Sequence, residues 1–202
     1  MERLNTQEIE VAKELMSAGL QKAAQSLSFF MKEEITLKST NFTTDSSHFV
    51  IQDANEYYVL TTVIKGELGG VCFLVFTPEE KNEICKVALP AEIFNNEQKL
   101  KAMQEPLLLE IDNIISASVI TQLANKLKTK MYGDVPSLRI ENKDNLTDLL
   151  GKHFNADKLV LEFQAEFIST KSHFHPIFIW VLEADFINRV RTILTEQQQT
   201  NG

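Results

Sequence analysis

The sequence predicts one α+β domain made of two diverged copies of a helix–strands–helix unit. A chain of 202 residues with 44% apolar residues is long enough for one well-buried core. The same order of elements occurs in both halves, and each half has two long strands with a short connection between them. A single domain over residues 1–202 is therefore expected, with repeats at about 6–88 and 106–195, a junction at 89–105 and a polar tail at 197–202.

The first repeat starts with a long helix over residues 6–34, where apolar residues recur at helical spacing and no proline intervenes. A polar stretch at 40–48 then breaks the pattern. Runs of β-branched and aromatic residues predict a short strand and two long strands, at 49–52, 57–65 and 70–76. The glycine-rich link between the last two predicts a hairpin.

A short helix closes the first repeat at residues 78–88. Thr77 is placed as the N-cap, Pro78 as the first helical residue and Glu80 as the third, which is the pattern of a capping box. The next segment, 90–105, is polar and is expected to be irregular or at most a brief helix.

The second repeat has the same order, with one small helix added after the short strand. It is expected to contain a long helix, a short strand, a small helix, two long strands and a closing helix, at residues 106–130, 137–140, 144–154, 158–168, 177–183 and 185–195. Strands joined by connections too short for a crossover pair antiparallel. The result is a mostly antiparallel sheet of about six strands, covered by the two long helices, with shorter helices following the strands.

Composition excludes several classes of function. The net charge of −8 and the pI near 5.1 oppose sequence-independent binding to phosphate, so no nucleic acid partner is expected. The N-terminus lacks a signal peptide and no apolar run has the length of a membrane span, which predicts a cytoplasmic protein that does not bind membranes. Cys72 and Cys85, the only cysteines, are expected to be reduced core residues.

One motif in the second long helix carries chemistry. Glu110 and Asn113, followed by Pro136, form the pattern Glu-x2-Asn-x22-Pro, and three other Glu-x2-Asn pairs in the chain lack the proline at that distance. This pattern resembles the signature of the CheC, CheX and FliY family of chemotaxis phosphatases. The order of elements over nearly the whole chain matches the internally duplicated CheC-like fold of that family.

The resemblance implies a function and a site. In this family the substrate is the aspartyl phosphate of a CheY-like receiver domain, which carries its own magnesium ion, so neither metal nor cofactor is expected on this chain. By resemblance Asn113 orients the attacking water and Glu110 pairs with a receiver lysine. Ser116 and Ala117 are small enough to let the receiver approach, and Pro136 completes the partner-binding set. A homodimer is open, because CheX-like relatives pair.

Two departures from the family pattern qualify this expectation. Pro106 stands where the family often has Asp or Ser, and it is expected in the first turn of its helix. In the first repeat Glu14 matches the motif glutamate, but Ser17 and Thr40 replace the asparagine and the proline. No active site is therefore expected in the first repeat.

Other interpretations of the same residues stay open. The chain could be a non-catalytic adaptor like the flagellar-switch relatives, which use this fold for assembly. The second long helix has apolar residues on every side, and the phosphatase hypothesis fails if Asn113 faces inward. A metal site at His173 and His175 with Glu166 or Glu183 is a weaker alternative, because no carboxylate has a fixed spacing to the histidines.

Overall fold

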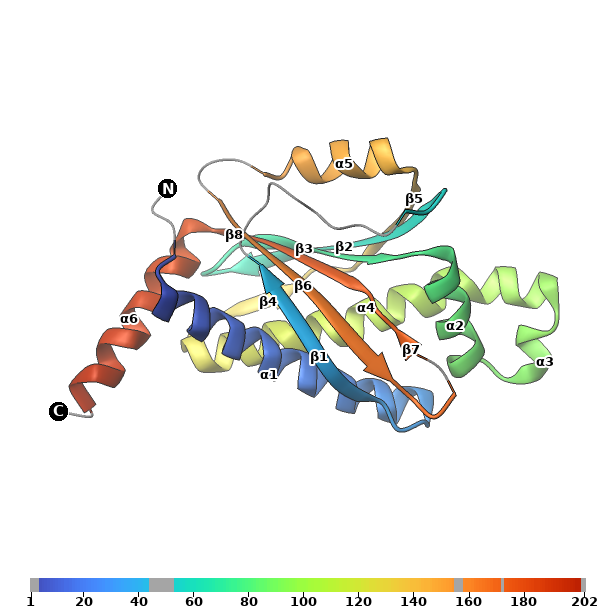
Figure 1. The fold of residues 1–202 in the computed structure, drawn as a ribbon, viewed down its shortest axis with the longest axis horizontal. Helices are drawn as coiled ribbons and strands as arrows, with labels where there is room; N and C mark the ends of the chain where they lie inside the picture. Colours follow the sequence, from blue (N-terminus) through green and yellow to red (C-terminus); the bar gives the residue numbers. More distant parts are fainter. Residues whose placement is uncertain (1–3, 44–52, 155–157, 172, 201–202) are drawn as a thin grey trace.

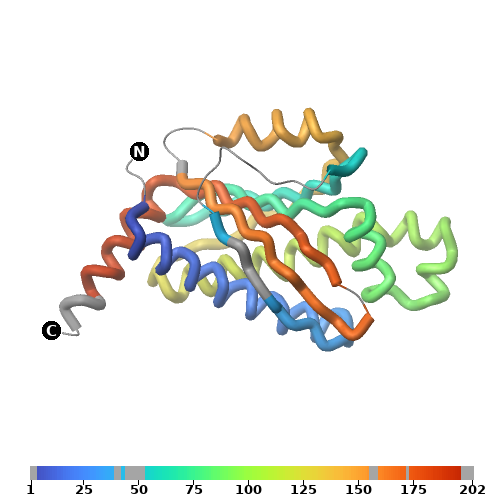
Figure 2. Tube along the Cα trace, in the orientation of Figure 1, coloured from blue at the N-terminus to red at the C-terminus, as the bar shows by residue number. Residues whose placement is uncertain are grey.

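The structure, a computed structural model, describes residues 4–43, 53–154, 158–171 and 173–200 (Figures 1 and 2). The helices are α1 (Thr6–Met31), α2 (Pro78–Ala88), α3 (Ala91–Phe94), α4 (Glu97–Leu127), α5 (Lys143–Gly151) and α6 (Ala184–Thr200). The strands are β1 (Thr36–Thr43), β2 (Tyr57–Gly66), β3 (Gly70–Phe76), β4 (Met131–Gly133), β5 (Ser137–Glu141), β6 (Lys158–Ile168), β7 (His173–Phe174) and β8 (Ile177–Glu183).

These strands form one antiparallel sheet. Its order is β1-β6-β8-β3-β2-β4, with β5 also on β2 and β7 on β6. The hairpin pair β2–β3 and the pair β6–β8 confirm the expected antiparallel pairing. The two halves meet where β3 pairs with β8, for example at Cys72 and Trp180. Each half places its first strands beside the other half's long strands, as two related copies would, although the division into repeats stays a prediction.

The sheet lies between two layers of helices of unequal size. Figure 1 shows α1 and α4 side by side on one face and α5 on the other. The larger core lies under α1 and α4, and a smaller core lies between the sheet and α5. The long helices approach closely at Gly19, where an added Cβ would lie 2.9 Å from the Cα of Val119. The predicted α+β fold, with two long helices over an antiparallel sheet, is confirmed.

Local signals in the sequence account for several boundaries. At α2, the Thr77 side chain accepts from the Glu80 N–H, and the Glu80 side chain accepts from the Thr77 N–H, which confirms the expected capping box. In the β2–β3 hairpin Gly66 has φ +121°, a conformation that L side chains rarely adopt, and an added Cβ would collide with the Lys130 carbonyl oxygen. Glycine is therefore required where the hairpin passes the link between α4 and β4.

Three expectations about boundaries were wrong, and two short strands were not expected. The junction is shorter than expected: α3 is the brief helix allowed there, but α4 already begins at Glu97. β1 (Thr36–Thr43) runs into the polar stretch at 40–48 that was expected to carry no strand, and it pairs with β6 as an edge strand. Residues 197–200 continue α6 rather than forming a tail. The two-residue β7 and three-residue β4 were not expected, and the strand expected at 49–52 lies outside the described residues.

α4 has the length and composition of a membrane span, although no apolar run of that length was expected. Among the described residues it alone is long and apolar enough to cross a membrane, with mean hydropathy 1.4 over an 18-residue window. Half of that window is buried within the domain. The helix is apolar on two sides because it packs against α1 on one side and against β2 and β4 on the other.

Candidate functional site

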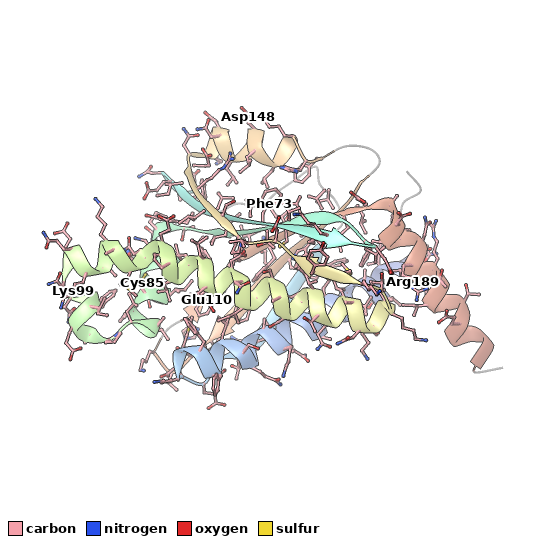
Figure 3. The ribbon with its side chains drawn as sticks, turned by 180° about the vertical axis from the view of Figure 1, so that it is seen from behind. Phe73, Cys85, Lys99, Glu110, Asp148 and Arg189 are labelled. Carbon is pink, nitrogen blue, oxygen red and sulfur yellow. The ribbon has the colours of Figure 1, made fainter. Side chains whose placement is uncertain are left out.

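Glu110 and Asn113 lie together on the exposed side of α4. Residues three apart on a helix project from one side, and both of these residues are exposed; Figure 3 labels Glu110 on the middle of the helix. Neither side chain is hydrogen-bonded to another described residue. The condition for the phosphatase hypothesis, an outward-facing Asn113, is met.

A short connection between two strands faces this side of α4. Both β4 and β5 pair with β2, and residues 134–136 interrupt them. The Asp134 N–H donates to the Val63 carbonyl oxygen at 2.8 Å, and Lys65 Nζ lies 2.5 Å from Asp134 Oδ2. Pro136, which has no N–H to give to a ladder, stands just before β5. The backbone and the side chain of Asp134 therefore both bind this connection to β2.

The helix and the connection enclose a groove of about 380 Å³. Its lining residues are Pro106, Leu109, Glu110 and Asn113 from α4 and Gly133, Asp134, Val135 and Pro136 from the connection. The three residues of the Glu-x2-Asn-x22-Pro pattern, far apart in sequence, thus line one surface feature. Val135, 85% exposed, gives its rim an apolar side chain.

The two small residues beyond Asn113 have different positions. Ala117 is exposed on the same side of α4 as Asn113, one turn further along. Ser116 is 4% exposed, and its hydroxyl donates to the Asn113 carbonyl oxygen at 3.4 Å. Ser116 follows Asp112 by four residues on the buried side of the helix, so its small side chain does not line the groove, and the part it plays in partner binding stays a prediction.

The groove combines exposed acids with a buried one beneath it. The Lys65 ammonium lowers the pKa of Asp134, so this carboxylate is ionised at neutral pH. Behind Asn113, the Asp112 carboxyl is buried, and burial raises its pKa from 3.8 to about 7 despite a hydrogen bond from Thr62. Neither Asp134 nor Asp112 is among the site residues that the sequence predicts. Asp134 could have been found from its place two residues before Pro136. Asp112 could have been found as a charged residue inside an apolar run.

Pro106 lies well inside α4 rather than in its first turn, so this expectation was wrong. The helix begins at Glu97, and the side chain of Asn96 caps it by accepting from the Lys99 N–H at 3.0 Å. Because proline has no backbone N–H, the Ala102 carbonyl oxygen four residues earlier has no donor within the helix. Ala102 is exposed, so water can donate to this oxygen instead. Pro106 therefore contributes an apolar ring to the groove.

The remaining candidate residues form no second site. In the part of the chain that the structure describes, no group of three or more His, Cys, Asp or Glu side chains could hold a metal ion. His173 is exposed on β7, and the His175 N–H donates to Glu80 Oε1. Cys72 and Cys85 are free and buried, as expected.

Comparison with known proteins gives likenesses of structure alone, because no family model and no curated protein matches the sequence. The crystal structure of FliY from Thermotoga maritima superposes with a TM-score of 0.70 at 19% identity, covering 96% of this chain and 99% of that chain. CheX from Desulfovibrio desulfuricans superposes with a TM-score of 0.56 at 12% identity, covering 84% of this chain and 99% of that chain.

A third likeness involves a complex. A chain in the CheX–CheY–BeF3–Mg²⁺ complex from Borrelia burgdorferi superposes with a TM-score of 0.53 at 15% identity, covering 84% of this chain and 97% of that chain. At these identities the likeness establishes the fold. The CheC-like fold expected from the motif and the order of elements is thereby confirmed.

Proposed function

We propose that this chain, which has the fold of the CheC, CheX and FliY chemotaxis proteins, is a cytoplasmic phosphatase that hydrolyses the aspartyl phosphate of a CheY-like receiver domain. One observation carries the proposal. Glu110 and Asn113 are exposed side by side in the groove that Pro136 also lines. A partner can therefore meet an amide and a carboxylate together.

The chemistry asks little of this chain. Water attacks phosphorus in line with the bond to the aspartyl oxygen; that bond breaks, the free carboxylate leaves, and the proton of the water passes to phosphate or solvent. Catalysis of such a step is mainly positioning and neutralisation of charge. The receiver supplies the neutralising magnesium ion. This chain needs to supply only a group that holds the water in line.

Asn113 suits that task. A carboxamide offers one acceptor and two N–H donors and carries no charge. Its oxygen accepts a hydrogen bond from the attacking water, and an anionic phosphoryl group does not repel it as it would a carboxylate. Asn113 is exposed, so its amide can enter another protein's pocket, and a helix holds it in a more precise position than a loop would.

Glu110 and the opposite wall provide docking. The Glu110 carboxylate, one turn from Asn113, pairs with a lysine of the receiver and sets its register. Asp134 adds a second negative charge across the groove, which favours a cationic edge on the partner. Pro106, Val135 and Pro136 supply apolar contact, and the small Ala117 leaves room for close approach.

A second function, a non-catalytic adaptor of the flagellar switch, is favoured by one observation. A chain in the FliG–FliM complex from Helicobacter pylori superposes with a TM-score of 0.57, similar to that of CheX. An adaptor of this kind would bind a receiver or another partner through the same groove and leave the phosphoryl group intact.

Release of phosphate from a panel of phosphorylated CheY-like receivers separates the two functions. The phosphatase proposal expects wild type to accelerate release from at least one receiver, and Asn113→Ala to lose about 100-fold of that acceleration. The same variant should bind the beryllofluoride-activated receiver within about fivefold of wild type. Binding by wild type without any acceleration would favour the adaptor.

A further inference from the structure

A buried carboxyl lies directly behind the proposed catalytic amide. Asp112 is 1% exposed and stands between Ile111 and Asn113 on α4, with its side chain turned toward the sheet. Its Oδ2 accepts a hydrogen bond of 2.6 Å from Thr62 Oγ1 on β2. A buried carboxyl costs free energy, and a neutral residue of similar size would pack here without that cost. The proposed hydrolysis gives Asp112 no chemical role.

Thr62 links Asp112 to the other wall of the groove. Its Cγ2 methyl packs against Gly133 so closely that a Cβ added there would lie 3.0 Å away, and Ile120 of α4 would lie 3.1 Å away on the same glycine. Gly133 is the last residue of β4 and opens the connection that lines the groove. A line of contacts therefore runs from Asp112 through Thr62 to Gly133.

We propose that Asp112 is a positioning residue whose hydrogen bond to Thr62 holds the two walls of the groove at the spacing that Asn113 needs to enter a receiver. The inference rests on the proposed function for its meaning in catalysis. That this hydrogen bond sets the spacing of the two walls does not depend on the proposed function.

The surroundings of Asp112 make the bond sensitive to pH. Among the described residues Thr62 is its hydrogen-bond partner, and the titratable group that faces it from β3 is the Cys72 thiol, whose pKa burial and the Asp112 charge raise well above its usual value. The pKa of Asp112 itself is raised to about 7 by burial. The ionised carboxylate binds the Thr62 hydroxyl more strongly than the neutral acid does. The hydrogen bond between Asp112 and Thr62 therefore strengthens as the pH rises through 7.

Nuclear magnetic resonance of the full chain tests this without a receiver. The side-chain amide of Asn113, assigned with Asn113→Ala, and the backbone amide of Val135 report the two walls. Both should shift with a midpoint near pH 7 in wild type and lose that shift in Asp112→Asn. The control is Glu162→Gln, which neutralises another buried carboxyl with a raised pKa, on β6 away from the groove, and should keep both shifts.

Three further variants separate the hydrogen bond from folding. Thr62→Val removes the donor and keeps a methyl beside Gly133, so the Asn113 signal should lose its pH dependence. Thr62→Ser keeps the donor and removes that methyl, so the Asn113 signal should keep its pH dependence. The double variant Asp112→Leu, Thr62→Val replaces both partners with apolar groups and so is expected to fold. If the Asn113 and Val135 signals of the double variant match those of wild type, the bond does not control the groove and the inference is wrong.

Activity then distinguishes failure of the inference from failure of the proposed function. On a receiver that wild type dephosphorylates, the double variant should lose about tenfold in kcat at nearly unchanged KM, because binding through Glu110 remains. If wild type accelerates no receiver while both walls titrate with Asp112, the proposed function fails and the inference about the groove survives. Full kcat in a correctly folded double variant would overturn the inference alone.

Discussion

Replacing Asp112 by asparagine should stabilise the domain at neutral and alkaline pH. The folded state raises the pKa of Asp112 from 3.8 to about 7, because burial disfavours the charged form more than the Thr62 hydroxyl favours it. The folded protein therefore holds this proton more tightly than the unfolded chain does. The stabilisation from the protonated acid is complete below pH 3.8 and is lost as the pH rises to 7.

The magnitude follows from the same two values. At about 1.4 kcal/mol for each pH unit, the full effect is about 4 kcal/mol, of which about 3 kcal/mol falls between pH 5 and 8. Asparagine keeps an oxygen for the Thr62 hydroxyl and does not titrate. The free energy of unfolding of Asp112→Asn, minus that of wild type, should therefore rise by about 3 kcal/mol from pH 5 to pH 8.

Urea unfolding of both proteins at pH 5, 6, 7 and 8 measures this difference, and subtraction removes the contribution of every other titrating group. Glu110→Gln, on the exposed side of the same helix, is the control and should change the free energy of unfolding by no more than about 0.5 kcal/mol at any of these values. A difference between Asp112→Asn and wild type that stays flat within about 0.5 kcal/mol would refute the assignment of a buried, partly neutral acid beneath the groove.

Three further outcomes are expected. Gly19→Val should lower the free energy of unfolding, measured by thermal melts, by about 1–3 kcal/mol, because an added Cβ would lie 2.9 Å from the backbone of α4. Gly151 has open space around it, so the control Gly151→Ala should not destabilise the domain in the same melts. Asn113→Asp should bind a receiver but lose most of the rate of phosphate release, since it places a charge against the phosphoryl group; a rate equal to wild type would remove the case for an uncharged amide. The Arg191 guanidinium lowers the pKa of Glu8, so the stability from this pair is present above the ordinary value of 4.5 and is lost on acidification below it; Arg191→Met should destabilise the domain at pH 7 and less at pH 3, as measured by urea unfolding at both.

The sequence was sufficient to predict the long strands and the motif, and insufficient to assign the faces of α4. Apolar residues surround this helix because α1 and the sheet both cover it, so hydrophobic periodicity alone does not show which side is outside. The spacing itself holds the answer. Glu110, Asn113 and Ala117 recur at helical spacing on the exposed side, and Asp112 and Ser116, four apart, share the buried side.

The start of α4 was misplaced because Pro106 gave a stronger signal for a helix start than the true N-cap, Asn96. Proline is common in the first turn of a helix, so Pro106 suggested a helix start. Asn96 is the true cap, and it stands before a polar run whose exposed residues could equally belong to a loop. Burial of the following turns against the domain holds the interior proline in place, and tertiary packing of this kind is not visible in local sequence.

The edges of the sheet were also beyond local patterns. β1 reads Thr-Leu-Lys-Ser-Thr-Asn-Phe-Thr, a polar edge strand that pairs with β6 from the other half of the chain. β4 has three residues and depends on β2 for its hydrogen bonds. Such strands exist because a partner strand is available, so only the folded arrangement reveals them. The second wall of the groove belongs to this class, which is why Asp134 was missed.

The central claim is that the amide of Asn113 enters the phosphorylation pocket of another protein and holds water there. The most direct measurement is a crystal structure of this chain bound to a CheY-like receiver activated with beryllofluoride and magnesium. We expect the Asn113 side chain within about 3 Å of the position in line with the bond between beryllium and the aspartyl oxygen. A complex in which the receiver occupies another surface, or in which Asn113 stays outside the pocket, would contradict the account.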